Sequence, residues 1–408
     1  MNPESETGSR KNPRPWKFRC YWTAAFFIAL LGCLLRFHVW HDFEYVGFDE
    51  QIYCSYLESL DSGGITAFPD IFRTYIVEVQ KAEHVYLPPT RIGYQLPAFA
   101  IHRVTHLPVL ASLRMVSVLS GCLFMLAGFF FALRWLNRRL ALAVLALLAC
   151  APLQIHMTQY AFVDGVAGLA ALLSVACFWE SIRHQGKWIA GFGASFLFLL
   201  LTKQETAVFA GLFFVVILAF SRLLGLGKTG WMQWAAFLLA PVAAILVLSL
   251  LAGDCGTLIE TLVVNARLQM SLPYTLAMGG GPWYRYLVEH LFVNPVVFLL
   301  ATGFGICLAR QTALNKYLLL FLVLTYAVMC AIPHGMNIRH TVMWDFPVVI
   351  FAVQCLDWIV VPVRKKGVLF AVMVAAVCLI ELRQFDTIFV TLYDTDPTFM
   401  FRKVELTR

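Results

Sequence analysis

The sequence predicts an all-α integral membrane protein, and two observations carry this prediction. Of the 408 residues, 60% are hydrophobic and only 13% are charged, and the mean hydropathy is +0.74. About eleven apolar runs divide the chain, most of them close to the roughly 20 residues that a helix needs to cross a bilayer. This composition excludes a soluble globular enzyme and a disordered scaffold.

The apolar runs place the expected membrane spans in order along the chain. They lie near residues 21–39, 115–136, 140–156, 162–182, 188–202, 206–221, 231–252, 291–309, 317–333, 341–361 and 367–382.

The distribution of Lys and Arg predicts the orientation. With the N-terminus in the cytoplasm, 17 of the 31 Lys and Arg residues fall in the N-terminal segment and the inner loops. We therefore expect a cytoplasmic tail over 1–20, a membrane region over 21–382 and an outer tail over 383–408, most simply in a bacterial inner membrane. The net charge of +7 is scattered between apolar runs, so no nucleic acid partner is expected.

Two long segments, 40–114 and 253–290, lie on the outer side in this topology. Loops of this length in a compact protein are usually functional. The first holds nine of the 24 acidic residues, either because it acts on a substrate or because positive-inside sorting leaves acids outside. Cys54 and Cys255 lie in these segments and are either a disulfide or two free thiols.

An adjacent pair of carboxylates, Asp49 and Glu50, follows the first span and opens a helix expected over 51–60. Neighbouring carboxylates repel unless a cation or a metal offsets them. The alternative is that they complement the dipole at the helix N-terminus.

Further polar residues stand at the outer ends of later spans. Arg91 follows Pro88-Pro89 and is either a phosphate ligand or an anchor at the membrane surface. Asp164 opens the fourth span, with His156 or a basic residue as its expected partner, and Lys203 is placed to pair with it across the bundle.

The order of these elements resembles the polytopic glycosyltransferases of the GT-C type, in the branch of the protein O-mannosyltransferases and the aminoarabinose transferase of lipid A. The resemblance covers about residues 23–225. It rests on Phe48-Asp49-Glu50 with Tyr53, Pro88-Pro89, Leu113-Arg114-Met115-Val116-Ser117, Asn137-Arg138-Arg139, the stretch from Gln159 to Asp164, and Leu201-Thr202-Lys203.

The resemblance implies a GT-C fold and transfer of a sugar from a polyprenyl-phosphate donor, with inversion, to a lipid, protein or glycan acceptor at the outer face. It implies that Asp49 is the general base and that Glu50 and Asp164 position the acceptor or a metal, with Asp49 and Asp164 as the ligands of an optional Mg²⁺ or Mn²⁺.

The same resemblance implies substrate contacts for Tyr53 and Lys203. The aminoarabinose branch has an arginine two residues after Asp-Glu and a Glu-Lys before the prolines, where this chain has Ile52 and Tyr86-Leu87. Phosphate binding is therefore expected from the cations Arg91, Arg267 and Arg339.

Two other classes remain open from the sequence. A transporter or flippase of a lipid-linked or small anionic substrate also needs many spans, but it predicts charges near the middle of spans, whereas Arg36, Glu180 and Asp357 lie towards span ends. A structural membrane subunit gives no reason for an acidic first outer segment.

Overall fold

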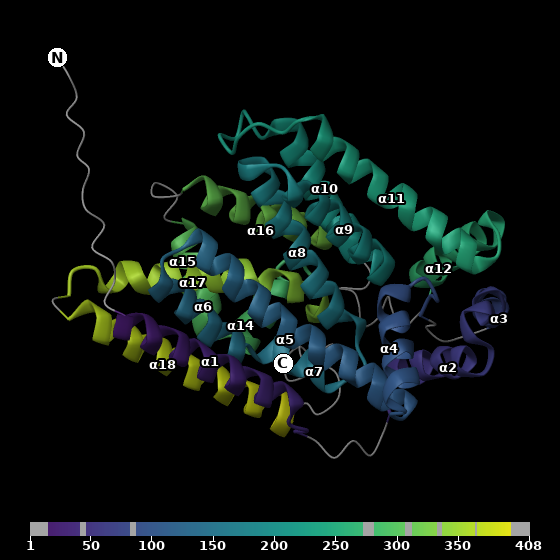
Figure 1. Ribbon diagram of the computed structural model, residues 1–408, viewed down its shortest axis with the longest axis horizontal. Helices are drawn as coiled ribbons and strands as arrows, with labels where there is room; N and C mark the ends of the chain where they lie inside the picture. The colour runs from purple at the N-terminus through teal and green to yellow at the C-terminus, as the bar shows by residue number, and fades with distance from the viewer. Residues whose placement is uncertain are drawn as a thin grey trace.

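The computed structural model describes residues 15–40, 46–81, 87–271, 281–306, 312–332, 337–363 and 365–392. Within these ranges the chain forms helices and connecting segments, with no β-strand among them (Figure 1). The prediction of an all-α fold is confirmed. Expectations for residues 1–14, for Tyr86 and for the tail beyond residue 392 lie outside the described residues.

Seven described helical stretches are long and apolar enough to cross a membrane. They are α1 (Pro15–Phe37), α5 (Val109–Trp135), α8 (Val163–His184), α11 (Trp231–Ala252), α16 (Ala313–Ala331), η3 (Ile338–Trp344) continued by α17 (Asp345–Val360), and α18 (Lys366–Phe385) continued by the π-helical turn η4 (Asp386–Leu392). The chain is thus an integral, multi-pass membrane protein.

The other expected spans coincide with shorter or bent helices. The run at 140–156 is α6 (Arg138–Cys150) and α7 (Pro152–Gln159), which bend by 45° at their junction. The remaining three are α9 (Lys187–Thr202), α10 (Gln204–Phe220) and α15 (Pro295–Ile306), which follows α14 (Arg285–Val293). Length and composition support seven or eight spans, so the number eleven remains a prediction.

Helix α8 lies at the centre of the bundle, with 94% of its most apolar stretch buried. It is hydrophobic on every side and packs against α5, α9, α10 and η3. A Cβ atom at Gly168 would lie 2.5 Å from the side chain of Val342. Glycine therefore lets η3 approach α8 closely, which places Arg339 and His340 beside the N-terminal end of α8.

The bend between α6 and α7 explains the buried Arg36 at the end of α1. Pro152 starts α7 and leaves carbonyl groups of α6 without helical partners. The Arg36 guanidinium donates to the carbonyl oxygens of Leu148 at 2.8 Å, Ala149 at 3.1 Å and Gly32 at 2.9 Å. Arg36 is therefore a cap for the broken helix.

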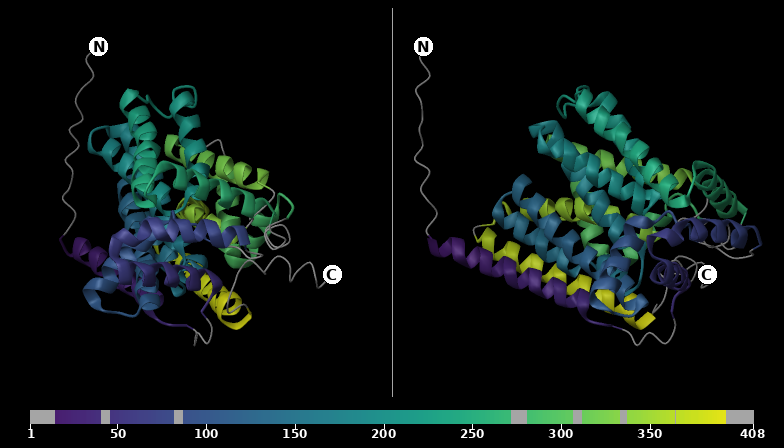
Figure 2. Two further views of the ribbon diagram at one scale, coloured as in Figure 1. Left: turned by 90° about the vertical axis from the view of Figure 1, so that its right-hand side faces the viewer. Right: turned by 45° about the vertical axis from the view of Figure 1, so that its right-hand side comes forward.

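The two long segments that the Lys and Arg distribution places on the outer side meet at one end of the bundle (Figure 1, and the right-hand view of Figure 2). The first forms α2 (Phe48–Gly63), η1 (Gly64–Ala67), α3 (Phe68–Lys81) and α4 (Ile92–Thr105); the second forms α12 (Cys255–Ser271), which packs on α3. Cys54 and Cys255 are free thiols.

An apolar cluster shared by α2, α3 and α4 with the adjacent parts of α5, α8 and α11 fixes α2 in place. Its buried side chains include Tyr53, Leu57, Leu60, Phe68, Phe72, Tyr94 and Leu113. The helix expected over 51–60 is confirmed and extends in both directions.

Several expected boundaries differ from the structure by a few residues, and two of them have a clear physical cause. Helix α5 begins at Val109, directly after Pro108, rather than near residue 115. At the other end, the boundary expected after residue 382 falls inside α18, because Phe385, Ile388 and Phe389 are apolar side chains that are buried against α7 and η3.

Candidate functional site

The first turn of α2 places the two adjacent carboxylates in different environments. Gly47 precedes the helix in an extended conformation, and its N–H donates to Glu50 Oε2 at 3.0 Å. This bond is half of a capping box, so the helix-capping explanation holds for Glu50. Asp49 keeps 24% of its side chain exposed and pairs with Arg339.

Glu50 is completely buried and ties three elements together. Its oxygens accept from Arg114 Nε at 2.9 Å, from Arg114 Nη2 at 3.0 Å and from the Ala161 N–H at 2.7 Å. Arg114 belongs to α5, and Ala161 lies in the short turn between α7 and α8. Because both oxygens already accept hydrogen bonds, Glu50 fixes the start of α2 relative to α5 and to the turn before α8.

Asp49 pairs with Arg339 across 290 residues of sequence. Arg339 Nη1 lies 3.0 Å from Asp49 Oδ2, and the guanidinium lies 4.7 Å from the ring centre of Phe162. The Asn337 side chain caps η3 by accepting from the Arg339 N–H at 3.0 Å. These contacts bring the tenth expected span to the start of α2.

Asp164 forms a buried ion pair with Lys203, as the sequence predicted. Lys203 has an extended backbone between α9 and α10, and its Nζ also lies 2.9 Å from His340 Nδ1. Arg339 and His340 both act electrostatically on Asp164. His156, the other expected partner, instead stacks on Phe389 at 4.3 Å.

Arg91 is buried beside α2 and links the first outer segment to α10. Its Nη1 donates to the Tyr53 hydroxyl at 2.7 Å, and its Nη2 lies 3.5 Å from Glu205 Oε1. Burial raises the pKa of Tyr53 above its ordinary value, so this hydroxyl stays protonated. Arg91 therefore has defined ligands and is not merely an anchor at the surface.

Seven of the eight predicted site residues lie in four neighbouring groups of contacts, which we call the ionic cluster. The groups are Asp49 with Arg339, Glu50 with Arg114, Asp164 with Lys203 and His340, and Arg91 with Tyr53 and Glu205. Electrostatic interactions of Asp49 and Asp164 with Tyr53, and of Arg339 with Asp164, link the groups. Arg267 is separate, because it is exposed on α12, whose contact with the first outer segment runs through α3.

Three members of the ionic cluster were not singled out as site residues from sequence. Arg114 is part of the motif Leu113-Arg114-Met115-Val116-Ser117, and Glu205 directly follows Thr202-Lys203-Gln204; each is a charge next to an apolar run. His340 directly follows Arg339. A charged residue at the end of an expected span is therefore the sequence feature that could have identified these residues.

The two carboxylates expected to hold a metal do not fit that purpose in this arrangement. Asp49 is bonded to Arg339 and Asp164 to Lys203, so each anionic charge already has a cation beside it. In the described part of the chain, no group of three or more His, Cys, Asp or Glu side chains is placed to hold a metal ion. We derive no step through a metal.

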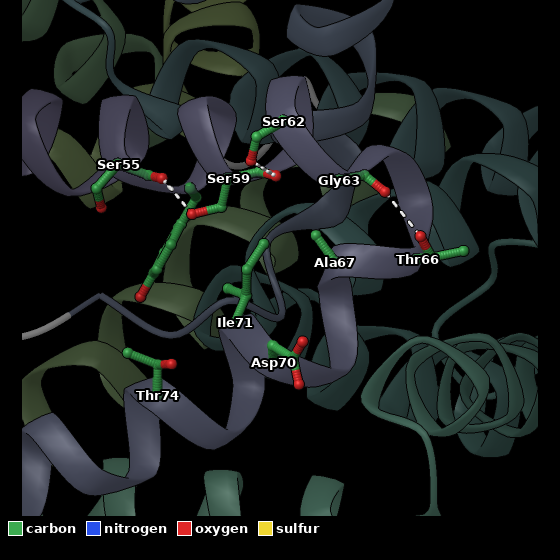
Figure 3. Close-up of a pocket in the computed structure, with 10 residues that line it drawn as sticks. Ser55, Ser59, Ser62, Gly63, Thr66, Ala67, Asp70, Ile71 and Thr74 are labelled. Atoms are coloured by element: carbon green, nitrogen blue, oxygen red, sulfur yellow. Dashed lines mark hydrogen bonds between the residues drawn. The ribbon is translucent and has the colours of Figure 1, made fainter.

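A separate cavity of about 500 Å³ lies between α2 and α3, far along α2 from Asp49 (Figure 3). Its lining is rich in hydroxyl groups, from Ser55, Ser59, Ser62, Thr66 and Thr74. The first four of these hydroxyls donate to carbonyl oxygens of their own helical segment. The chemistry of the ionic cluster, rather than this cavity, identifies the candidate site.

Searches of protein-family models and of curated proteins found no match to the sequence. Solved structures do match. An oligosaccharyltransferase from Archaeoglobus fulgidus, solved in complex with Zn and sulfate, aligns with a TM-score of 0.61 and 12% identity over 89% of this chain and 52% of its own. The present chain thus spans about half the length of that protein.

ArnT from Cupriavidus metallidurans aligns with a TM-score of 0.50 over 95% of this chain and 76% of its own. The identity is 15% for its apo state and 16% for its complex with undecaprenyl phosphate. At these identities the comparison establishes the fold. The GT-C fold that the sequence resemblance predicted is confirmed.

Proposed function

We propose that the protein is an inverting glycosyltransferase that moves a sugar from a polyprenyl-phosphate donor to a lipid, protein or glycan acceptor at the outer face of the membrane. The observation that carries the proposal is the ionic cluster itself. It pairs a partly exposed carboxylate, Asp49, with Arg339, and it holds two further cations, Arg91 and Lys203, in the neighbouring pairs where the outer helices meet the membrane helices.

This arrangement suits the chemistry of such a donor. The lipid tail stays in the bilayer while the sugar phosphate lies at its surface, so a site between outer and membrane-embedded helices reaches both. One Cupriavidus ArnT structure with the same fold contains undecaprenyl phosphate, which supports a lipid-linked donor. Arginine binds phosphate with two parallel hydrogen bonds, and the cluster supplies guanidinium groups for that contact.

The reaction assigns Asp49 the role of general base. Its carboxylate takes the proton of the acceptor hydroxyl as the hydroxyl oxygen attacks the anomeric carbon from the face opposite the phosphate. The bond between that carbon and the phosphate oxygen breaks, and the electron pair leaves with the polyprenyl phosphate. A cation such as Arg339 stabilises the negative charge on the departing phosphate.

The other members of the cluster position these groups. Glu50 and Arg114 fix the start of α2, and therefore the direction of Asp49. Asp164 holds Lys203 and acts on Arg339, so it sets the field in which the phosphate binds. The distribution of Lys and Arg supports a cytoplasmic N-terminus and an outer active site in a bacterial inner membrane.

The test is complementation of a deletion strain with the native protein or with Asp49→Asn, at membrane levels matched by blotting. Mass spectrometry of lipid A, glycoproteins and polysaccharide measures the product. We expect one sugar-sized mass to vanish in the deletion, to return with the native protein and to stay absent with Asp49→Asn.

A matched control is Asp61→Asn. Asp61 lies on the same helix, 3.1 Å from Arg103, with 43% of its side chain exposed. This variant should restore the sugar. Full restoration by Asp49→Asn would refute the role of Asp49 as the base, and a deletion without any change in glycoconjugates would favour the transporter class.

A further inference from the structure

The pair between Asp49 and Arg339 is open to water on both of its partners. Asp49 and Arg339 keep 24% and 18% of their side chains exposed, whereas Asp164 and Lys203 keep 6% and 4%. In the other two pairs of the ionic cluster one partner is buried: Glu50 is fully buried beside Arg114, and Arg91 keeps 9% of its side chain exposed beside Glu205. Water screens the attraction between Asp49 and Arg339 more than that of a pair with a buried partner, so this pair is the easiest to exchange.

We infer that the donor phosphate takes Arg339 from Asp49, so that binding of the anionic donor is what frees the base. This inference rests on the proposed function and adds a mode of regulation to the same site. In the resting site, Arg339 holds the Asp49 carboxylate. Once the phosphate accepts the guanidinium, Asp49 is available to the acceptor hydroxyl.

The geometry around Arg339 favours a change of partner without a change of fold. The Phe162 ring lies 4.7 Å from the guanidinium, and the Asn337 cap fixes the backbone of η3. Close packing of η3 on α8 at Gly168 holds the segment from the other side. The guanidinium therefore stays in place while its anionic ligand changes.

The exchange is favourable because the two ligands bind arginine differently. Asp49 contacts Arg339 through one oxygen and the Nη1 nitrogen. The donor phosphate is a phosphodiester with one negative charge, like a carboxylate, but its two free oxygens can accept two parallel hydrogen bonds from one guanidinium. The site thereby distinguishes a lipid-linked sugar phosphate from a neutral glycolipid, because only the phosphate releases the base.

The experiment measures binding of undecaprenyl phosphate to the purified full-length protein in lipid nanodiscs. It compares the native protein, Asp49→Asn, Arg339→Gln and the double variant, with Asp61→Asn as the control. We expect Asp49→Asn to bind about fivefold more tightly, which corresponds to removal of a competing ion pair of about 1 kcal/mol. Arg339→Gln should bind more weakly.

The double variant separates competition from simple charge repulsion. If Asp49 competes for Arg339, the gain from Asp49→Asn disappears in the Arg339→Gln background. If Asp49 merely repels the phosphate, the gain persists there, and the inference is wrong. Inorganic phosphate, added as a competitor, tells whether the headgroup alone is recognised or whether the lipid chain is required.

Different results would overturn the proposed donor class and the exchange at Arg339. A native protein that does not bind undecaprenyl phosphate would overturn the proposed donor class and this inference with it. A native protein that binds the lipid, together with an Asp49→Asn variant that binds equally or more weakly, would overturn the inference and leave the proposed function standing.

Discussion

The bond between Glu50 and Arg114 gives the sharpest prediction about stability. The perturbation is Arg114→Met, which keeps an unbranched side chain of similar length but removes the guanidinium. Glu50 would then be a fully buried carboxylate whose remaining donors are the N–H groups of Gly47 and Ala161.

The magnitude follows from burial. Breaking a buried ion pair by removing one partner costs roughly 3–5 kcal/mol, because the remaining charge is uncompensated. Arg114 keeps 21% of its side chain exposed, so water reaches this pair and the lower end of that range applies. We expect a loss of about 3 kcal/mol.

A second substitution tests the reasoning by its sign. In the native background, Glu50→Gln should destabilise the protein, because it weakens a charge-assisted bidentate bond. In the Arg114→Met background the same change should stabilise the protein, because it removes the uncompensated charge. Thermal unfolding in one detergent at fixed lipid content measures both effects.

The control is Arg103→Met, which breaks the exposed pair with Asp61 and should change the free energy of unfolding by less than about 1 kcal/mol. If Glu50→Gln destabilised the protein equally in both backgrounds, Arg114 would not stabilise the protein by compensating the buried charge of Glu50.

Two further predictions concern buried groups away from the ionic cluster. Arg36→Met should lower the free energy of unfolding by about 3 kcal/mol, because it leaves carbonyl groups at the bend between α6 and α7 unpaired. Arg36→Lys should lower the free energy of unfolding by less. Unchanged thermal unfolding of Arg36→Met would contradict the capping role. Glu289 in α14, ahead of the apolar α15, has a pKa raised to about 7, because burial outweighs the opposing effect of Arg285. The folded protein therefore binds the carboxyl proton of Glu289 more tightly than the unfolded chain does, because the carboxyl has its ordinary pKa of 4.5 when the chain is unfolded. The free energy of unfolding should fall by up to about 3 kcal/mol as the pH rises from about 4.5 to about 7. Glu289→Gln should flatten that fall, and equal pH profiles of unfolding temperature for the two proteins would show that Glu289 does not cause it.

The helices were predictable from sequence because lipid leaves the backbone no alternative. A run of about 20 apolar residues must satisfy its own N–H and C=O groups, so each expected span coincides with a helix. Breaks were less predictable. The bend at Pro152 depends on Arg36, which lies more than 110 positions earlier and supplies the donors that make the break tolerable.

The positions of the site residues were predictable for a related reason. Asp49 stands in the first turn of α2, Asp164 in the first turn of α8, Lys203 between α9 and α10, and Arg339 in η3. At helix ends the backbone has unsatisfied polar groups, so charged side chains are tolerated where the apolar pattern stops. A charge at the end of an apolar run is therefore a usable signal in one sequence.

The pairing of these charges depends on how the helices rotate and pack, which periodicity does not determine. Lys203 was expected to meet Asp164 because both stand at outer ends of adjacent expected spans. Asp49 and Arg339 belong to different outer connections, and their contact requires the close approach of η3 to α8 at Gly168. The sequence therefore showed where the acids and cations stand, but the packing of the helices determines their partners. Glu50 is held by four hydrogen bonds, whereas the adjacent Asp49 remains accessible to a substrate.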